Sequence, residues 1–386
     1  MNKKITLGLT ISLVAIAAAV TFILTSLFSL RSFNEKLVDF NEKAEKYEKL
    51  EALDTLVREE YFGEIDEEEL SDGILKGYMS GTGDEYSRYL NAEEYQDELA
   101  EDTGKRVGLG ITVTEDESGY ILINEILDGS PLKNSDIKVG DIIVSVDDTD
   151  VLRDGYDKAV NALKGAEGTD VTIIVRRDGI DRKRTFKRVA VEIVTVSGEM
   201  LDGYIGLIKI SGFKKNTSEQ FIAELEKLSS NGAKGFIFDL RDNAGGLVST
   251  LEKCIDPLLP EGTVATAVYK DGHEDTLVYS DESELNIPMV VLVNAKTASV
   301  AELFTASLKD FGKVKVVGQR TFGKGVMQET IPLENGGAAV ITVAEFRTAV
   351  SGSFNNVGIT PDYIVENEIP DIDIQLDKAV EVLNEE

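Results

Sequence analysis

The feature that most constrains this chain is an uncharged segment near its amino terminus, from residue 5 through residue 30. Lys3 and Lys4 precede it, and Arg31 ends it. As a helix, this length spans the roughly 30 Å of a bilayer's hydrocarbon core, and the leading lysines favour an N-terminus inside the cell. We therefore expect residues 1–30 to form a cytoplasmic tip and an uncleaved transmembrane signal-anchor, with residues 31–386 outside the cytoplasm. There are two alternatives: a signal peptide that is cleaved to release the protein, and a buried core helix.

Composition limits the chemistry of the rest. The chain has 386 residues, and single cores stop growing at roughly 250–300 residues, so we expect several domains. Its 70 acidic and 40 basic residues give a net charge of −30, which argues against binding nucleic acid through its phosphates. A single cysteine, Cys254, argues against disulfide and multi-cysteine metal sites, and we expect no metal and no cofactor. The single histidine, His273, lies in a polar stretch that predicts an exposed hairpin tip, which disfavours a histidine-based catalytic centre.

Changes in amino-acid composition and hydrophobic pattern divide the remaining chain into three parts. Residues 31–103 are acidic and predicted to be helical, with a break at residues 81–84, and an amphipathic pattern over residues 33–60 fits either a solvated stalk or a homodimer contact. Residues 104–190 alternate short β-branched runs with glycine and aspartate turns, which indicates a small β-rich module. Residues 191–386 alternate strands with helices, as in an α/β layered fold.

The individual elements follow from the same patterns. The strands predicted in the β-rich module are residues 110–114, 120–126, 141–146 and 171–176, with one helix at residues 156–163. The strands predicted in the α/β part are residues 203–210, 235–240, 288–293 and 314–317. Its predicted helices are residues 218–229, 299–311 and 374–383.

One motif resembles a phosphate-binding loop but lacks its context. The segment Gly318-Gln-Arg-Thr-Phe-Gly323-Lys324 matches the spacing G-x-x-x-x-G-K. Gly325 stands where the loop needs a magnesium-binding hydroxyl, and residues 326–333 are predicted to form a strand instead of the required helix. The sequence therefore disfavours nucleotide binding.

Three other segments carry candidate chemistry. Ser299 follows a buried apolar strand and starts a helix, so it is either an ordinary helix cap or a nucleophile beside free backbone N–H groups. Lys324 lies among glycines and apolar residues, so it is either a surface charge or a desolvated base of the kind that activates a serine without histidine. Gly245 and Gly246 end a polar turn after a strand, and they either form a plain turn or let the backbone approach a ligand closely.

Together these segments resemble the carboxyl-terminal processing peptidases, the S41 serine proteases that use a Ser-Lys dyad. The resemblance extends to Asp84-Glu-Tyr86-Ser-Arg-Tyr-Leu90, to a PDZ core from Ser130-Pro131 to Ile143, and to Gly358-Ile-Thr-Pro361-Asp362. It implies a multidomain fold of the α/β and β classes. The expected order is an N-terminal transmembrane helix, a helical stalk and cap region, a PDZ domain at residues 104–190 and an α/β S41 protease core at residues 191–386.

The resemblance also implies roles for individual residues. Ser299 aligns with the family's nucleophile, Lys324 with its base, and Gln328 with the glutamine that orients the base. The backbone N–H groups of Gly245 and Val300 would form the oxyanion hole. The PDZ loop that takes a substrate's terminal carboxylate aligns with Gly108, Leu109, Gly110 and Ile111.

The implied function is that of a membrane-anchored serine endopeptidase that recognises free, apolar carboxyl termini of proteins and forms an acyl-enzyme. Two other classes stay open. One is a catalytically silent PDZ adaptor at the membrane, which the intact Ser, Lys and Gln set disfavours. The other is an esterase or cell-wall hydrolase, which the absence of a G-x-S-x-G motif around Ser299 disfavours.

Overall fold

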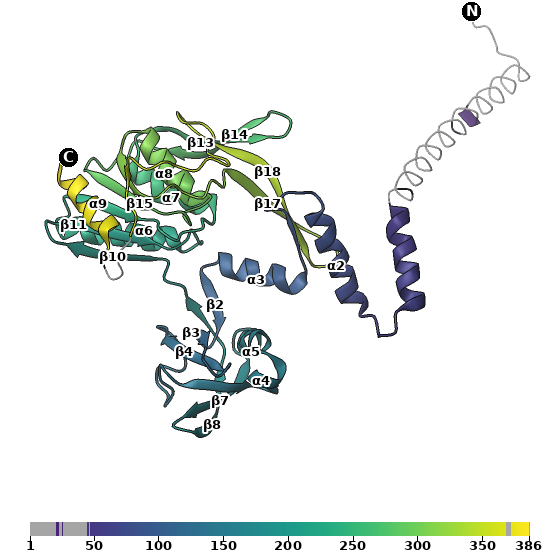
Figure 1. Cartoon of the computed structure of the whole chain (residues 1–386). Helices are drawn as coiled ribbons and strands as arrows, with labels where there is room; N and C mark the ends of the chain where they lie inside the picture. Colours follow the sequence, from purple (N-terminus) through teal and green to yellow (C-terminus); the bar gives the residue numbers. More distant parts are fainter. Residues whose placement is uncertain (1–20, 23–24, 26–44, 46, 368–371, 386) are drawn as a thin grey trace, which may run out of the picture. The chain divides into compact units, whose positions relative to one another are not determined.

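The computed structural model describes residues 21–22, 25, 45, 47–367 and 372–385 (Figure 1). The predicted signal-anchor and the first part of the predicted helix at residues 33–60 therefore lie largely outside the described residues. Within those residues, no helix combines the length and the apolar character that crossing a bilayer requires. The chain divides into two compact units, residues 1–71 and residues 72–386.

In the first unit, residues 47–60 are helical, as the amphipathic pattern predicts. The guanidinium of Arg58 pairs with Asp54 one turn earlier and with Glu67 at the start of the next helix. The apolar side chains on and after this helix are exposed within the unit, and they include Leu50, Leu53, Leu56, Tyr61 and Phe62. The stalk and the dimer-contact interpretations of this helix both stay predictions.

The segment before the β-rich module contains one strand that the sequence did not indicate. Helices α2 (Glu67–Ser80) and α3 (Ala92–Asp102) confirm the helical prediction. Between them lies β1 (Arg88–Leu90), which pairs antiparallel with β18 (Ala338–Thr348), far along the chain. A three-residue strand with so distant a partner leaves no periodic pattern, so the helical prediction, whose only break was at residues 81–84, was wrong at β1.

The β-rich module is an antiparallel sheet with two short helices. Its strands are β3 (Ile111–Glu115), β4 (Ile121–Ile126), β5 (Ile142–Val146), β6 (Thr149–Asp150), β7 (Asp170–Arg177) and β8 (Ile180–Lys187). Its helices are α4 (Val151–Asp154) and α5 (Tyr156–Leu163). Every second residue of β7 is buried, namely Val171, Ile173 and Val175. The prediction missed β8, whose side chains are mostly charged and exposed, as is common at a sheet edge.

A short ladder carries the chain into and out of this module. Strand β2 (Lys105–Gly108) leads in, β9 (Val189–Glu192) leads out, and the two pair antiparallel. The side-chain amide of Asn216 donates to the carbonyl of Gly104 and to that of Ile193, both at 3.0 Å. One side chain of the α/β part thus holds both connecting segments.

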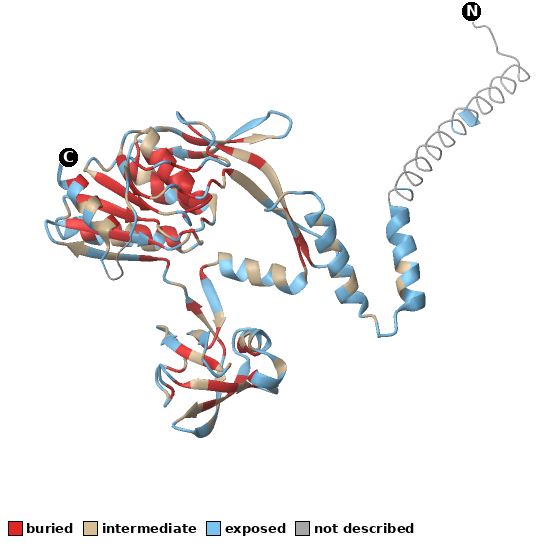
Figure 2. Ribbon diagram, in the orientation of Figure 1, coloured by how far each residue is buried: buried red, intermediate tan, exposed pale blue. Residues whose placement is uncertain are grey.

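The α/β part is built on a six-stranded sheet. In spatial order its strands are β10 (Val196–Leu201), β11 (Ile205–Ile210), β12 (Gly235–Asp239), β15 (Met289–Val293), β16 (Val314–Gly318) and β19 (Tyr363–Ile364). All neighbours are parallel except β10 and β11. Strands β12 and β15 are buried along their whole length, which explains why their sequences are apolar apart from Asp239 at the end of β12 (Figure 2).

Helices cover both faces of this sheet. Three of them share one apolar core with the sheet: α6 (Thr217–Ser230), α7 (Val248–Ile255) and α8 (Val300–Asp310). A short 3-10 helix, η1 (Asp256–Leu258), follows α7. Helix α9 (Ile374–Glu385) packs with the opposite face in a second core. Because parallel strands end at the same edge, the turns after β12 and β15 meet, and that edge is where ligands of such sheets bind.

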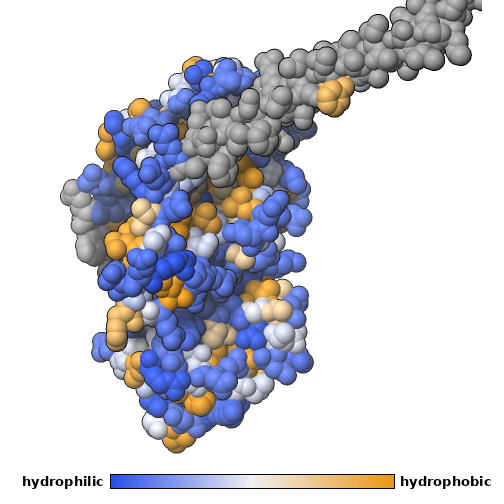
Figure 3. Space-filling model, turned by 90° about the vertical axis from the view of Figure 1, so that its right-hand side faces the viewer, coloured by the Kyte–Doolittle hydropathy of each residue, from blue (hydrophilic) through white to orange (hydrophobic). Residues whose placement is uncertain are grey.

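A second sheet stands beside the first. It contains β1, β18, β13 (Gly262–Tyr269), β14 (Glu274–Ser280) and β17 (Val326–Pro332). Strand β17 pairs with β18 along its length, and β13 and β14 form a hairpin (Figure 1). His273 lies at the tip of that hairpin, exposed, with Nε2 2.8 Å from a carboxylate oxygen of Asp275, which confirms the prediction for this residue. On the face shown in Figure 3, hydrophilic side chains predominate, as the acidic composition leads one to expect.

Candidate active site

Ser299 occupies a strained turn between a buried strand and a buried helix. It follows β15 and directly precedes α8, and its φ of 55° and ψ of −119° lie in a region that non-glycine residues rarely adopt. An ordinary helix cap has extended dihedral angles, so this backbone does not fit the simple capping interpretation. The residue is 7% exposed and lines a cleft of about 460 Å³.

Lys324 lines the same cleft and is half-buried, so it is not an ordinary surface lysine. It precedes β17, in the glycine-flanked segment that resembles a phosphate loop and that continues, as predicted, into a strand. Burial lowers the pKa of Lys324, the charge of Arg88 lowers it further, and Asp84 opposes both. Its Nζ atom lies 4.8 Å from the centre of the Tyr86 ring.

Gln328 also lines the cleft, from strand β17. Its side-chain amide donates to Thr342 Oγ1 at 3.1 Å, on the neighbouring strand β18. The three side chains that the sequence proposed thus line one cleft, and within the described residues no hydrogen bond joins any two of them. That Gln328 orients Lys324 stays a prediction.

The two predicted oxyanion groups are also neighbours. Gly245 has a φ of 102°, and a Cβ atom there would lie 2.9 Å from Ser299 Cβ and 3.0 Å from the backbone nitrogen of Val300. Only glycine therefore fits at this contact. The N–H of Gly245 donates to Asn243 Oδ1 at 2.8 Å, so this donor is engaged in the structure. Its role as an oxyanion donor stays a prediction, and it requires that Asn243 release the N–H.

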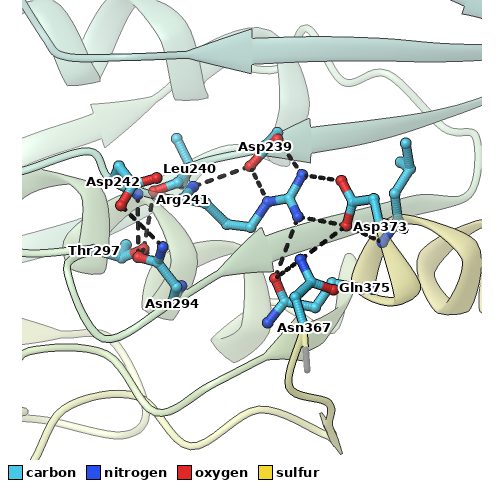
Figure 4. Close-up of polar contacts among 10 residues, drawn as sticks. Asp239, Leu240, Arg241, Asp242, Asn294, Thr297, Asn367, Asp373 and Gln375 are labelled. Atoms are coloured by element: carbon cyan, nitrogen blue, oxygen red, sulfur yellow. Dashed lines mark hydrogen bonds and ion pairs between the residues drawn. The ribbon is translucent and has the colours of Figure 1, made fainter. Parts of the chain in front are cut away.

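Hydrogen bonds join the turn of Gly245 to the turn of Ser299. The hydroxyl of Thr297 donates to the carbonyl of Leu240 at 2.8 Å, and the N–H of Ala298 donates to the carbonyl of Asn243 at 2.9 Å. Asp242 and Asn294 exchange two further hydrogen bonds, at 3.1 and 3.2 Å (Figure 4). The two strand-end turns thus form one connected piece.

The C-terminal helix anchors this piece from the other side. The guanidinium of Arg241 makes paired hydrogen bonds with Asp239 and with Asp373, at 2.7 to 2.9 Å (Figure 4). It also donates to Gln375 Oε1 at 3.2 Å. Asp373 and Gln375 lie at the start of α9, so the end of the chain helps fix the turn that precedes Gly245.

The sequence reasoning missed one residue that the structure places at the centre of the site. Glu302 is completely buried in the first turn of α8. Its carboxylate accepts the N–H of Ser299 at 2.9 Å and that of Lys324 at 2.8 Å. It also accepts the N–H of Gly323 and the hydroxyl of Thr321. Four donors satisfy this buried charge, and they come from both the nucleophile turn and the lysine segment.

A signal for Glu302 was present in the sequence. The spacing Ser-x-x-Glu from Ser299 to Glu302 is that of a capping box, which predicts the contact with the N–H of Ser299. The contacts to the lysine segment carry no such signal, because they depend on how β16 and β17 bring residues 321–324 back to α8.

The walls of the cleft differ in character. The apolar lining comprises Leu247, Val248, Val326, Met327, Val340 and Phe346. The charged lining comprises Arg88, Glu98, Glu101, Asp102 and Lys214. Extended polypeptide can satisfy both walls, because it offers apolar side chains and a polar backbone.

A second groove lies in the β-rich module. Its volume is about 270 Å³, and the predicted carboxylate loop lines it at Gly108, Leu109, Gly110 and Ile111. Tyr156, Val160 and Leu163 of α5 line it too. Gly110 has a φ of 62°, and Ser130 Oγ donates to the carbonyl of Leu109 at 2.6 Å, which fixes the loop. The four predicted residues thus lie together beside an apolar helix face; carboxylate binding stays a prediction.

Comparisons with known proteins agree with this architecture. Peptidase family S41 matches residues 204–365, the PDZ domain matches residues 98–176, and the N-terminal domain of the activating protease CtpB matches residues 14–94. Carboxy-terminal processing protease CtpA of Bacillus subtilis (strain 168) is 32% identical over 328 residues, which are 84% of this chain and 70% of that protein.

Two further comparisons point the same way. The carboxyl-terminal-processing protease of Synechocystis is 30% identical over 299 residues, 75% of this chain and 70% of that protein. The solved structure of a photosystem II D1 C-terminal processing protease matches with a TM-score of 0.50 and 25% identity, over 84% of this chain and 88% of that one. The chain therefore belongs to the carboxyl-terminal processing proteases, serine peptidases of family S41 that carry a PDZ domain.

Proposed function

We propose that this serine peptidase is a membrane-anchored, extracytoplasmic endopeptidase that binds protein C-termini in its PDZ groove and cleaves through a Ser299–Lys324 dyad. The observation that supports the proposal is that a strained, buried serine and a desolvated lysine line the same cleft. Desolvation supplies the neutral lysine that a base needs, so no histidine is required.

The chemistry follows from these groups. Neutral Lys324 takes the proton of Ser299 Oγ as that oxygen attacks the scissile carbonyl carbon. The N–H groups of Gly245 and Val300 hold the resulting oxyanion. The C–N bond then breaks, and Lys324 gives its proton to the leaving amine. Water attacks the acyl-enzyme, Lys324 takes the water's proton, and the second product leaves as Ser299 regains its hydrogen. Gln328 orients Lys324 through these steps.

Substrate recognition begins in the PDZ groove. The loop from Gly108 to Ile111 presents backbone N–H groups to a terminal carboxylate, and the substrate adds as a strand beside β3. Tyr156, Val160 and Leu163 supply the apolar surface on which an apolar last side chain packs. The substrates are therefore unfolded or flexible proteins with free, apolar carboxyl termini.

Location and assembly complete the proposal. Residues 5–30 anchor the chain in the membrane, and the stalk, PDZ domain and protease core lie outside the cytoplasm. The exposed apolar face around Leu50, Leu53 and Phe62 supports a homodimer contact in the stalk. The proposed boundaries are residues 31–103 for the stalk and cap, 104–190 for the PDZ domain and 191–386 for the core.

One experiment tests the catalytic and recognition claims together. The chain is mixed with an unfolded reporter protein that ends in an apolar tail, and the products are identified by mass spectrometry. Parallel reactions use Ser299→Ala and a reporter with an amidated tail. We expect cleavage that the variant abolishes and that the amidated tail weakens. Cleavage retained in Ser299→Ala would refute the dyad.

One observation favours the alternative of a catalytically silent PDZ adaptor. The N–H of Gly245 already donates to Asn243, and an oxyanion cannot use it in that state. If the reporter binds through its tail and no product forms under any condition, the adaptor function replaces the protease function.

A further inference from the structure

The segment before the PDZ domain contributes to the catalytic cleft. Strand β1 pairs with β18 at three positions, and the turn before it, residues 84–87, docks on the same strand. The hydroxyl of Ser87 accepts the N–H of Thr342 at 3.0 Å and donates to Asp84, while the N–H of Tyr86 donates to Asp84 Oδ1 at 3.2 Å. Thr342 also holds Gln328, so the docked turn and the cleft share a strand residue.

This turn places an aromatic ring against the catalytic lysine. Lys324 Nζ lies 4.8 Å from the centre of the Tyr86 ring, within the range of a cation–π contact. Within residues 47–367 and 372–385, Nζ takes part in no hydrogen bond and no ion pair. In the described structure, the face of the Tyr86 ring is therefore the group that interacts electrostatically with this ammonium group. Burial raises the pKa of Tyr86 to about 12, so the ring stays neutral at ordinary pH.

Other charges face the lysine from several elements. Arg88 of β1 lowers the pKa of Lys324, and Asp84 of the docked turn raises it. Glu302 of α8 contacts only the backbone N–H of Lys324. The remaining charged groups in the cleft lining are Glu98, Glu101, Asp102 and Lys214.

We propose that Tyr86 is a positioning residue for Lys324, which holds the lysine by the face of its ring and stabilises the positive charge that the lysine acquires when it takes the serine's proton. The inference rests on the proposed Ser-Lys mechanism and adds a residue from outside the S41 match. An aromatic face suits this task better than a carboxylate. It attracts a cation without accepting a proton, whereas an adjacent carboxylate would keep the lysine charged and inactive as a base.

The test compares two substitutions in the full chain. Tyr86→Phe keeps the ring face, and Tyr86→Leu keeps apolar bulk without it. For Tyr86→Leu we expect kcat to fall roughly two- to thirty-fold, from the loss of a partly desolvated cation–π contact, with KM unchanged. Because the ring favours the charged lysine, the acid limb of the kcat profile should move to lower pH by roughly half to one unit. Tyr86→Phe should resemble the wild type in both respects.

Tyr363 offers a matched control, because its ring lies 5.0 Å from Lys378 Nζ in the same kind of contact. Tyr363→Leu should leave the position of the acid limb unchanged. Coincident profiles for Tyr86→Leu and the wild type would overturn the proposal, and so would a Tyr86→Phe variant as impaired as Tyr86→Leu. Circular dichroism identifies any variant that fails to fold. If Tyr86→Leu fails to fold, Tyr86→Met takes its place in the comparison with Tyr86→Phe.

A second measurement separates this inference from the proposed function. In the chain labelled with ¹³C and ¹⁵N lysine, NMR titration gives the pKa of Lys324, whose signal is identified by its loss in Lys324→Arg. We expect the pKa of Lys324 to be lower in Tyr86→Leu than in the wild type. That shift without any proteolysis would refute the proposed function and retain the contact. Proteolysis with an unchanged pKa would refute the positioning role alone.

Discussion

The two halves of the catalytic cleft are held in different ways. On the nucleophile side, the turns of Ser299 and Gly245 are joined by a set of hydrogen bonds between neighbouring strand ends of one parallel sheet. On the base side, Glu302 fixes the backbone of Lys324, while the side chain meets the ring of Tyr86. The comparison teaches that the parallel sheet positions the nucleophile turn through its own strand ends. The side chain of the base, in contrast, is contacted by a segment that is remote in the sequence.

The largest effect on kcat is expected from substitutions that remove the nucleophile or the base. Ser299→Ala and Lys324→Ala should each lower kcat at least about a thousand-fold, because nucleophile and base act as one unit. For the same reason the double variant should be no slower than either single variant. Steady-state cleavage of a peptide substrate measures all three, with circular dichroism to establish folding. Substantial activity in Lys324→Ala would mean that the base side of the comparison is misassigned.

The next effect concerns the one residue that joins the halves. Glu302→Gln keeps the size of the side chain and removes its charge. One of the two oxygens that accept hydrogen bonds from the four donors is then replaced by an NH₂ group. We expect the free energy of unfolding to fall by about 4 kcal/mol, since buried donors are costly to leave unsatisfied. Activity should fall as well, because the Ser299 and Lys324 segments are no longer held together.

Thermal and urea unfolding measure the stability change. Glu329→Gln is the matched control, because Glu329 is exposed on the adjoining strand β17 and the charge change is the same. Equal stability of the Glu302→Gln variant and the wild type would show that the carboxylate does not couple the two halves.

Sequence reasoning succeeded where chemistry leaves a local pattern. Ser299 and Gly245 follow apolar runs that fully buried parallel strands require, so the strand ends and their polar turns could be read directly. The glycine and apolar neighbours of Lys324 made it a candidate base beside the alternative of a surface charge, and the family resemblance implied its role. Helix α5 was predicted with the bounds that the structure has, since its apolar periodicity is strong.

Several of the missed features depend on tertiary contact between distant segments, and the others are local features that leave no apolar pattern. Strand β1 exists because β18 offers it a partner, and β8 is a charged edge strand that lacks an apolar pattern. The contact of Tyr86 with Lys324 and the clamp of Arg241 on Asp373 join residues that no spacing relates. Nor could the sequence show that Asn243 engages the N–H of Gly245, because that depends on the geometry of one turn.

The smallest effect is expected from removing a charged side chain near the base, Lys324. Arg88 lowers the pKa of Lys324, and Arg88→Gln should therefore raise it. A base works only when deprotonated, so a higher pKa moves the acid limb of activity to higher pH and lowers the rate below that limb. Arg88 is half-exposed and pairs with Glu98, so solvent screens its charge and we expect a shift smaller than that of Tyr86→Leu.

The direction of this shift distinguishes the two neighbours of the lysine. Arg88→Gln should move the limb upward, whereas Tyr86→Leu should move it downward, because one neighbour repels the ammonium group and the other attracts it. Arg347→Gln is the control, since Arg347 is an exposed arginine whose pairing partner is Glu274 on β14. High salt should reduce the difference between Arg88→Gln and the wild type and leave the effect of Tyr86→Leu, because salt screens exposed charges far more than a contact within a half-buried site. Shifts in the same direction for both variants would mean that a general disturbance of the cleft, and not the local charge, sets the protonation of Lys324.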